Sequence, residues 1–344
     1  MVERKSDFML KPDRSFFDRN TEQRPEIIEG LIREGQLAVL GGPFGVGKSP
    51  ALAHLTVSVL NGMPWCGRKV KKRPVVVIDF ENSAATYIAN VKRICNRLNV
   101  EFPKVPDELE VYMEQDSPDQ PGTKKLLEVL KETPANKLEF IRAILAGKPN
   151  ALVIIDPLEM LFRIDTLKKL SILALYSEIR ILLANFPRAV LLTTFNLRKQ
   201  DRRAGRPDLL FKPRVWLEEI CGSLDIMNRS DVRLGMDFLD ENEEIRVING
   251  VRRGEEMYPL LIRPVRDLDN LSGFEQCPPS ELDLPCGLTN KQREHWENLP
   301  QKFRFEEFAD KGVPRASLHR LIKRGKSLGI LDEQNGYWTK VVKL

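Results

Sequence analysis

Residues 42–49 have the types and the spacing that bind phosphate groups. They read Gly42-Pro43-Phe44-Gly45-Val46-Gly47-Lys48-Ser49, the pattern G-x-x-x-x-G-K-S of a phosphate-binding loop. Glycines let backbone N–H groups point at phosphate oxygens, the lysine reaches the terminal phosphates and the serine hydroxyl binds Mg²⁺. Pro50 follows directly, and proline is tolerated in the first turn of a helix. These residues predict a site for a nucleoside triphosphate with Mg²⁺.

The flanking residues supply the strand and the helix that such a loop needs. Residues 37–40 are a short apolar run suited to a buried strand, and a helical pattern with alanine and leucine begins at Ala51. A helix N-terminus adds a favourable dipole for anions. The alternative is a chance loop before a helix, and the flanks favour nucleotide binding.

Two further acidic positions follow apolar strand patterns. Asp156 closes the run 151–156, where it is suited to support Mg²⁺ beside Ser49. Glu81 follows the run 74–80 and is the candidate general base for the attacking water. The alternative for Glu81 is a solvated loop carboxylate, and Asp79 is the reserve candidate for the base.

The rest of the chain up to about residue 200 alternates helix and strand patterns. We expect helices over about 49–61, 84–98, 123–132, 136–146 and 166–184, and strands over 37–40, 74–80, 111–113, 151–156 and 189–195. All-apolar strands alternating with helices predict an α/β fold with a mostly parallel sheet and helices on both faces. Short strands over 231–238, 244–249 and 258–262 predict an antiparallel extension of this sheet.

The pattern resembles the RecA-fold ATPases over about residues 22–264. The resemblance rests on the loop 42–49, Phe80-Glu81-Asn82, Ile155-Asp156-Pro157 and Asn196-Leu197-Arg198-Lys199. The most similar group is the RepA-like plasmid replicative helicases, with related AAA-type ATPases of phages and mobile elements. This implies a RecA-like P-loop NTPase core, ATP and Mg²⁺ as ligands, Glu81 as catalytic base and a homo-oligomeric, hexamer-like ring.

The resemblance also implies a basic residue that enters the ATP site of the neighbouring subunit. Arg252 is the first candidate for this arginine finger and Arg253 the second, and an ordinary hairpin surface is the alternative. The departures from the family pattern are Pro50, Phe195 and Gly250. Gly250 stands where a lysine is common. A histidine or glutamine often senses the terminal phosphate where this chain has Phe195 and Asn196, so Asn196 could substitute for it only in part. These departures leave open a slow enzyme that acts as a switch.

The segment 196–214 is rich in basic residues that could follow a phosphate backbone. It contains Arg198, Lys199, Arg202, Arg203, Arg206, Lys212 and Arg214 against two aspartates. In a RecA-type ring this region faces the central channel, so we expect it to bind single-stranded DNA. A flexible, solvated charge run is the alternative.

The C-terminal residues have their own organisation and carry the net charge. We expect an N-terminal tail over 1–21, the ATPase domain over 22–265, a linker over 266–287 and a separate domain over 288–344. From Leu288 onward twelve Lys and Arg stand against seven Asp and Glu, which accounts for the net charge of +5.

This last segment resembles winged helix-turn-helix domains, whose third helix enters the major groove of duplex DNA. Three helix patterns are followed by a hairpin signal at Asn335-Gly336. The exposed face of the third helix would present Arg315, His319, Arg320, Lys323 and Lys326. The alternative is a protein-docking module, and the positive charge favours nucleic acid.

Composition narrows the class of protein. The 344 residues are 42% hydrophobic and 30% charged, with no apolar stretch of membrane-spanning length. Five scattered cysteines without C-x-x-C spacing predict reduced thiols in a cytoplasmic protein. The function we expect is an ATP-dependent, replicative helicase-like motor. The alternatives are an ATP-switched DNA-binding regulator or loader that does not unwind DNA, and a RecA-type recombination or repair ATPase.

Overall fold

The structure is a computed structural model of the chain. It describes residues 24–115, 117, 120–163, 169–197, 209–210, 212–220, 228–239, 243–252, 255–257, 259–267, 270–277, 295–296, 298–309, 314–327, 331–334 and 336–340.

One sheet of ten strands organises the body of the described chain, in the order β12-β11-β9-β8-β3-β7-β6-β4-β5, with β10 paired to β9. Six neighbouring strands are mutually parallel. They are β3 (Leu37–Gly42), β4 (Val75–Asp79), β5 (Leu109–Met113), β6 (Leu152–Asp156), β7 (Val190–Asn196) and β8 (Val232–Phe238). The mostly parallel α/β fold predicted from the sequence is therefore confirmed.

Antiparallel strands extend one side of this sheet. They are β9 (Arg246–Arg252), β10 (Glu255–Glu256), β11 (Leu260–Asp267) and β12 (Asn270–Gln276). A separate hairpin joins β1 (Glu26–Ile28) to β2 (Ile32–Arg33). The prediction of a linker from residue 266 is wrong for its first part, since β11 ends at Asp267 and β12 follows. The strand β12 escaped prediction because it contains glycine and polar residues and lacks a clean alternation of apolar positions.

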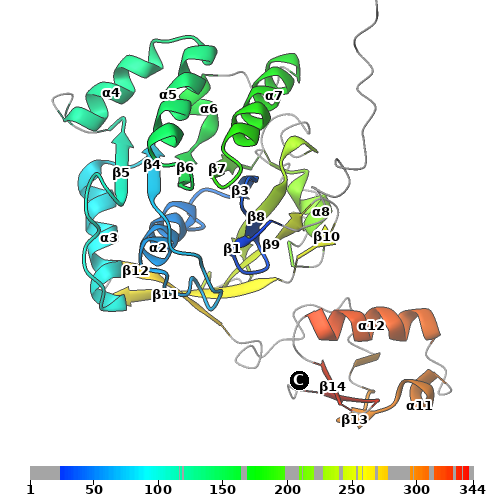
Figure 1. Cartoon of the computed structure of the whole chain (residues 1–344). Helices are drawn as coiled ribbons and strands as arrows, with labels where there is room; N and C mark the ends of the chain where they lie inside the picture. The colour runs from blue at the N-terminus through cyan, green and yellow to red at the C-terminus, as the bar shows by residue number, and fades with distance from the viewer. Residues whose placement is uncertain are drawn as a thin grey trace, which may run out of the picture.

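Helices cover both faces of the sheet (Figure 1). Helices α2 (Lys48–Asn61) and α3 (Ala84–Leu98) lie on one face. The other face carries α4 (Pro121–Leu130), α5 (Pro134–Gly147), α6 (Leu158–Phe162) and α7 (Lys169–Asn185). The short helix α8 (Pro213–Leu217) packs on β8 and β9.

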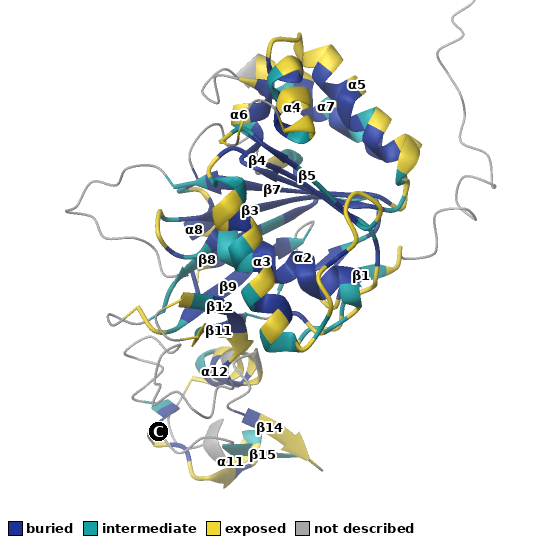
Figure 2. Ribbon diagram, turned by 90° about the vertical axis from the view of Figure 1, so that its left-hand side faces the viewer, coloured by how far each residue is buried: buried dark blue, intermediate teal, exposed yellow. Residues whose placement is uncertain are grey.

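The strand residues divide between two hydrophobic cores. On β4, Val76 and Ile78 belong to the core under α4–α7, whereas Val75 and Val77 belong to the core with α2 and α3. Figure 2 shows the central strands buried between exposed helix surfaces. Burial on both faces explains why these strands read as continuous apolar runs rather than as alternating ones.

The C-terminal residues form a second set of elements. Helices α11 (Phe305–Ala309) and α12 (Arg315–Ser327) are followed by the hairpin of β14 (Leu331–Gln334) and β15 (Tyr337–Lys340). A strand that the sequence did not predict, β13 (Lys302–Phe303), pairs with β15. The first of the three helices expected in this segment, over 288–299, lies mostly outside the described residues.

Among the residues that the structure describes, no helix is both long enough and apolar enough to cross a membrane.

Candidate nucleotide site

Parallel strands bring their carboxyl ends to one edge of the sheet, and the predicted site residues meet there. Gly42 of β3 is in register with Asn196 of β7, and Asp79 of β4 is in register with Asp156 of β6. The phosphate-binding loop leaves β3 at this edge, where ligands of open α/β sheets bind. Residues from four strands therefore converge although they are far apart in the sequence.

The phosphate-binding loop has the backbone that its motif requires. Gly45 and Gly47 have φ of +82° and +101°, values that side-chain-bearing residues rarely adopt. Gly47 precedes α2, which begins at Lys48. Pro50 lies in the first turn of this helix, where no intrahelical partner is lost. Phe44, at the loop tip, is 94% exposed.

The Lys48 ammonium group is held by oxygen atoms in this structure. Its Nζ donates to the Gly42 carbonyl at 3.0 Å, to the Pro43 carbonyl at 3.2 Å and to Asn196 Oδ1 at 3.1 Å. Burial lowers the pKa of Lys48, and this outweighs the opposing effect of nearby carboxylates. A buried ammonium group beside the loop is suited to bind phosphate oxygens.

The proposed metal ligands are adjacent. Ser49 Oγ donates to Asp156 Oδ2 at 2.8 Å, and the Thr194 hydroxyl donates to the other carboxylate oxygen of Asp156. Asp156 is buried, so its position is fixed by these partners. A hydroxyl beside a carboxylate at the first turn of α2 is a hard-oxygen set of the kind that Mg²⁺ prefers. The residues present therefore fit Mg²⁺ with a nucleotide.

Asn196 connects the lysine to the candidate base. Its side chain accepts a hydrogen bond from Lys48 and also hydrogen-bonds Glu81. Partial desolvation raises the pKa of Glu81, as does the nearby Asp156 carboxylate. A base with a raised pKa is better matched to neutral pH. The sequence identified Asn196 only as a departure from the family pattern, and the structure gives it this bridging position.

Asp79, the reserve candidate for the base, accepts hydrogen bonds from residues of the turn that follows β4. Its Oδ1 accepts from the backbone N–H groups of Glu81 and Asn82, at 2.8 and 2.9 Å, and its Oδ2 accepts from Asn82 Nδ2. These bonds set the path of the chain that carries Glu81.

Glu159 is a site residue that the sequence analysis missed. It lies in the first turn of α6, three residues after Asp156, and its Oε2 is buried without a hydrogen-bond partner among the described residues. Burial, then the carboxylates of Glu81 and Asp156, raise the pKa of Glu159 to about 7. The sequence signal was an acid three residues after a strand that ends in aspartate, but α6 was not predicted.

The predicted arginine finger is not at this chain's own phosphate-binding loop. Arg252 pairs with Glu26 at 3.1 Å and is in register with Val232, at the amino end of β8. Arg253 lies outside the described residues. A role for either residue in a neighbouring subunit stays a prediction.

The predicted DNA contacts fall into two groups. Arg198, Lys199, Arg202, Arg203 and Arg206 lie outside the described residues. On α12, Arg315, His319, Arg320, Lys323 and Lys326 are exposed, whereas Leu318, Leu321 and Ile322 are buried. The amphipathic pattern predicted for this helix is confirmed, and Lys326 also pairs with Glu333 at 2.9 Å.

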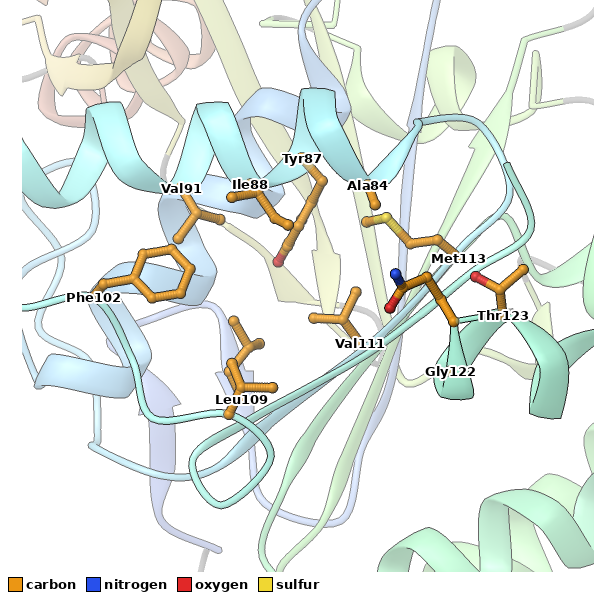
Figure 3. Close-up of a pocket in the computed structure, with 12 residues that line it drawn as sticks. Ala84, Tyr87, Ile88, Val91, Phe102, Leu109, Val111, Met113, Gly122 and Thr123 are labelled. Carbon is orange, nitrogen blue, oxygen red and sulfur yellow. The ribbon is translucent and has the colours of Figure 1, made fainter. Parts of the chain in front are cut away.

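A separate apolar pocket lies between α3 and β5 (Figure 3). Its volume is about 240 Å³, and its lining includes Tyr87, Ile88, Phe102 and Val111. None of the predicted site residues lines it, and its lining carries no charged side chain. It is therefore distinct from the phosphate site.

Comparisons with known proteins identify the family of this chain. The sequence has no significant match among curated proteins. A solved structure of a KaiC-like protein from Pyrococcus horikoshii OT3 is similar at a TM-score of 0.44 and 14% identity, covering 73% of this chain and 94% of that one. This likeness is too loose to add to the assignment. The model of the AAA domain family AAA_25 matches residues 3–194, more than half of the chain. The chain therefore belongs to this AAA domain family and is a P-loop ATPase.

Proposed function

We propose that this ATPase is a DNA-acting motor of the replicative helicase type, resembling the RepA-like helicases. The observation that carries the ATPase part is the convergence of Lys48, Ser49, Asp156, Glu81 and Asn196 at one sheet edge. The exposed basic face of α12 supports the DNA part.

The geometry supports a division of labour in hydrolysis. Lys48, released from the carbonyls of Gly42 and Pro43, would bind the terminal phosphates of ATP. Ser49 and Asp156 would hold Mg²⁺, which neutralises charge on the phosphates. Glu81 would take a proton from the attacking water, with Asn196 holding the carboxylate in place.

The oligomer and the DNA path remain part of the proposal. We infer a homo-oligomeric ring in which Arg252 or Arg253 completes the neighbour's site, single-stranded DNA binds the segment 196–214, and the C-terminal residues bind duplex DNA as a winged helix. Helix α12 with its following hairpin is consistent with that arrangement.

The test for the motor is the effect of DNA on hydrolysis. Changing Arg202 and Arg203 to Glu should abolish stimulation by single-stranded DNA while basal hydrolysis stays unchanged. Unaltered stimulation would contradict a channel role for this segment.

The second candidate is an ATP-switched regulator that binds duplex DNA without unwinding it. The position of Asn196 beside both Lys48 and Glu81 favours it, because the shorter asparagine stands there in place of the histidine or glutamine that the resemblance implies. A fork-unwinding assay separates the two: the motor unwinds forks in the presence of ATP, and the regulator does not.

A further inference from the structure

The phosphate-binding loop is contacted from outside by strands that lie beyond the family match, which ends at residue 194. From β9, Arg246 Nε donates to the Val46 carbonyl at 3.2 Å. From β12, the Phe274 ring lies so close to Gly47 that a Cβ there would be 3.0 Å from its Cζ. The antiparallel extension therefore supports both halves of the loop.

Several contacts hold the Arg246 side chain in this position. Its side chain is buried, and Nη1 donates to the carbonyls of Glu243 and Glu244 at 2.6 and 3.1 Å. Its guanidinium carbon also lies 5.0 Å from the centre of the Phe238 ring. A buried guanidinium is costly unless its donors find partners, and here backbone carbonyls accept three hydrogen bonds from it. The bond to Val46 is therefore held in one geometry.

Phe274 is equally constrained, by the helix that carries Lys48 and Ser49. The Phe274 N–H donates to His54 Nδ1 on α2 at 3.3 Å, and its carbonyl accepts from Arg97 Nη2 at 3.4 Å. His54 Nε2 lies 2.9 Å from the same Arg97 nitrogen. Burial, and then Arg97, lower the pKa of His54 to about 3, so the ring is neutral and keeps an acceptor nitrogen.

Gly273 makes the close approach of β12 possible. It has φ of +118°, and a Cβ there would lie 2.9 Å from Arg97 Nη2. The strand β12 therefore packs closely against α2 and α3. A displacement of the phosphate-binding loop or of α2 must move Phe274, and the reverse also holds.

We propose that Arg246 and Phe274 are positioning residues that preorganise the phosphate-binding loop, and that nucleotide binding in turn stabilises β12. Within the loop, Lys48 would give up its bonds to the Gly42 and Pro43 carbonyls when it binds phosphate, and the backbone bond from Val46 N to the Pro43 carbonyl is long, at 3.5 Å. Converging N–H groups bind phosphate well only when the backbone is already in place.

The test compares the full-length wild type with Arg246→Met, Arg246→Lys, Phe274→Ala and Phe274→Leu. Steady-state hydrolysis without DNA gives KM and kcat for ATP. We expect Arg246→Met to raise KM about tenfold, the loss typical of one hydrogen bond to a charged donor. Phe274→Ala should also raise KM, because it removes the ring that packs against Gly47. Arg246→Lys and Phe274→Leu should give KM values between those of the first two variants and that of the wild type. Arg142→Met, at a half-buried arginine of α5 that pairs with Glu139, is the control.

Two results separate positioning from a general loss of stability. A merely structural role would lower the melting temperature and the active fraction, and hence kcat, but would leave KM unchanged. Hydrogen exchange gives the second readout: a non-hydrolysable ATP analogue should slow exchange at residues 271–276 in the wild type and much less in Phe274→Ala. KM values within twofold of the wild type, or exchange at 271–276 that ignores the analogue, would overturn the proposal. Because no DNA is present, the result does not depend on the proposed motor function.

Discussion

At the scale of single residues, Asn196 is where the structure adds most to the motif. Lys48, Ser49 and Asp156 are the expected phosphate and metal residues, and their contacts agree with those roles. Asn196 hydrogen-bonds both Lys48 and Glu81, so it links the group that binds phosphate to the group that would activate water.

Replacing Asn196 should therefore affect the chemical step more than binding. We expect Asn196→Ala to lower kcat for ATP hydrolysis at least about tenfold, because a positioned base is typically worth 10²–10⁴-fold and Glu81 would lose its partner. KM should change less. A kcat equal to that of the wild type, measured with saturating ATP, would show that Asn196 does not position Glu81.

Glu159 predicts a pH dependence of stability. Its pKa rises from an ordinary 4.5 to about 7 through burial and the carboxylates of Glu81 and Asp156, with Lys48 opposing the shift. Folded chains hold this proton when unfolded chains have released it. The stabilisation is thus complete below about pH 4.5 and is lost as the pH rises through 7.

The measurement is the free energy of unfolding of the nucleotide-free protein between pH 5 and pH 8. We expect the wild type to lose on the order of 2 kcal/mol more than Glu159→Gln across this range. Glu139→Gln, at an exposed glutamate of α5, is the control. If the free energy of unfolding changes with pH equally in the wild type and in Glu159→Gln, the burial of a titrating carboxyl group at this position is contradicted.

At the scale of elements, the start of α6 is fixed by one buried hydroxyl. Thr193 Oγ1 of β7 accepts from the Leu158 N–H at 3.0 Å and donates to the Ile155 carbonyl at 2.9 Å. This hydroxyl joins the end of β6 to the first turn of α6, which carries Glu159.

Thr193→Val keeps the side-chain shape and removes both bonds. The buried N–H of Leu158 would then lack a partner, so we expect a loss of about 1–3 kcal/mol in the free energy of unfolding, measured by chemical denaturation. A loss below about 0.5 kcal/mol would mean that water or another group replaces the hydroxyl.

The elements that could be predicted from the sequence are those with strong local patterns. The helix expected over 84–98 is found at Ala84–Leu98, and the apolar runs became β4, β6 and β7. The short helix α6 and the strand β12 could not be predicted, because tertiary contacts stabilise them. The start of α6 depends on Thr193, and β12 depends on a left-handed glycine that packs against Arg97. The phosphate-binding loop was predictable because its motif is contiguous in the sequence. Glu159, Arg246 and Phe274 were not, because only the tertiary structure brings them close to the site.

At the scale of the whole molecule, the charge lies at the C-terminal end of the chain. The net charge of +5 is carried by residues 288–344, and α12 exposes Arg320 and Lys323 opposite a buried apolar face. Under the proposed function this surface binds the phosphates of duplex DNA.

Charge reversal at α12 should weaken duplex binding and reduce its salt dependence. For Arg320→Glu with Lys323→Glu, we expect the slope of log K against log salt to become less steep by about 2, since each lost phosphate contact contributes about 0.9. Fluorescence anisotropy between 50 and 200 mM salt measures this slope. Lys124→Glu with Lys125→Glu on α4 makes the same charge change elsewhere and should leave the slope unaltered. A slope unaffected by the α12 changes would favour a protein-docking role for the C-terminal residues.

The most direct test of the account is steady-state ATP hydrolysis with Mg²⁺, measured without DNA, with single-stranded DNA and with duplex DNA. The wild type and Lys124→Ala, an exposed lysine of α4, should hydrolyse ATP faster with single-stranded DNA, and Lys48→Ala should lose both basal and stimulated activity. Weak hydrolysis that single-stranded DNA does not stimulate, together with tight binding of duplex DNA, would contradict the motor function and favour the ATP-switched regulator. Hydrolysis that survives Lys48→Ala would contradict the site itself.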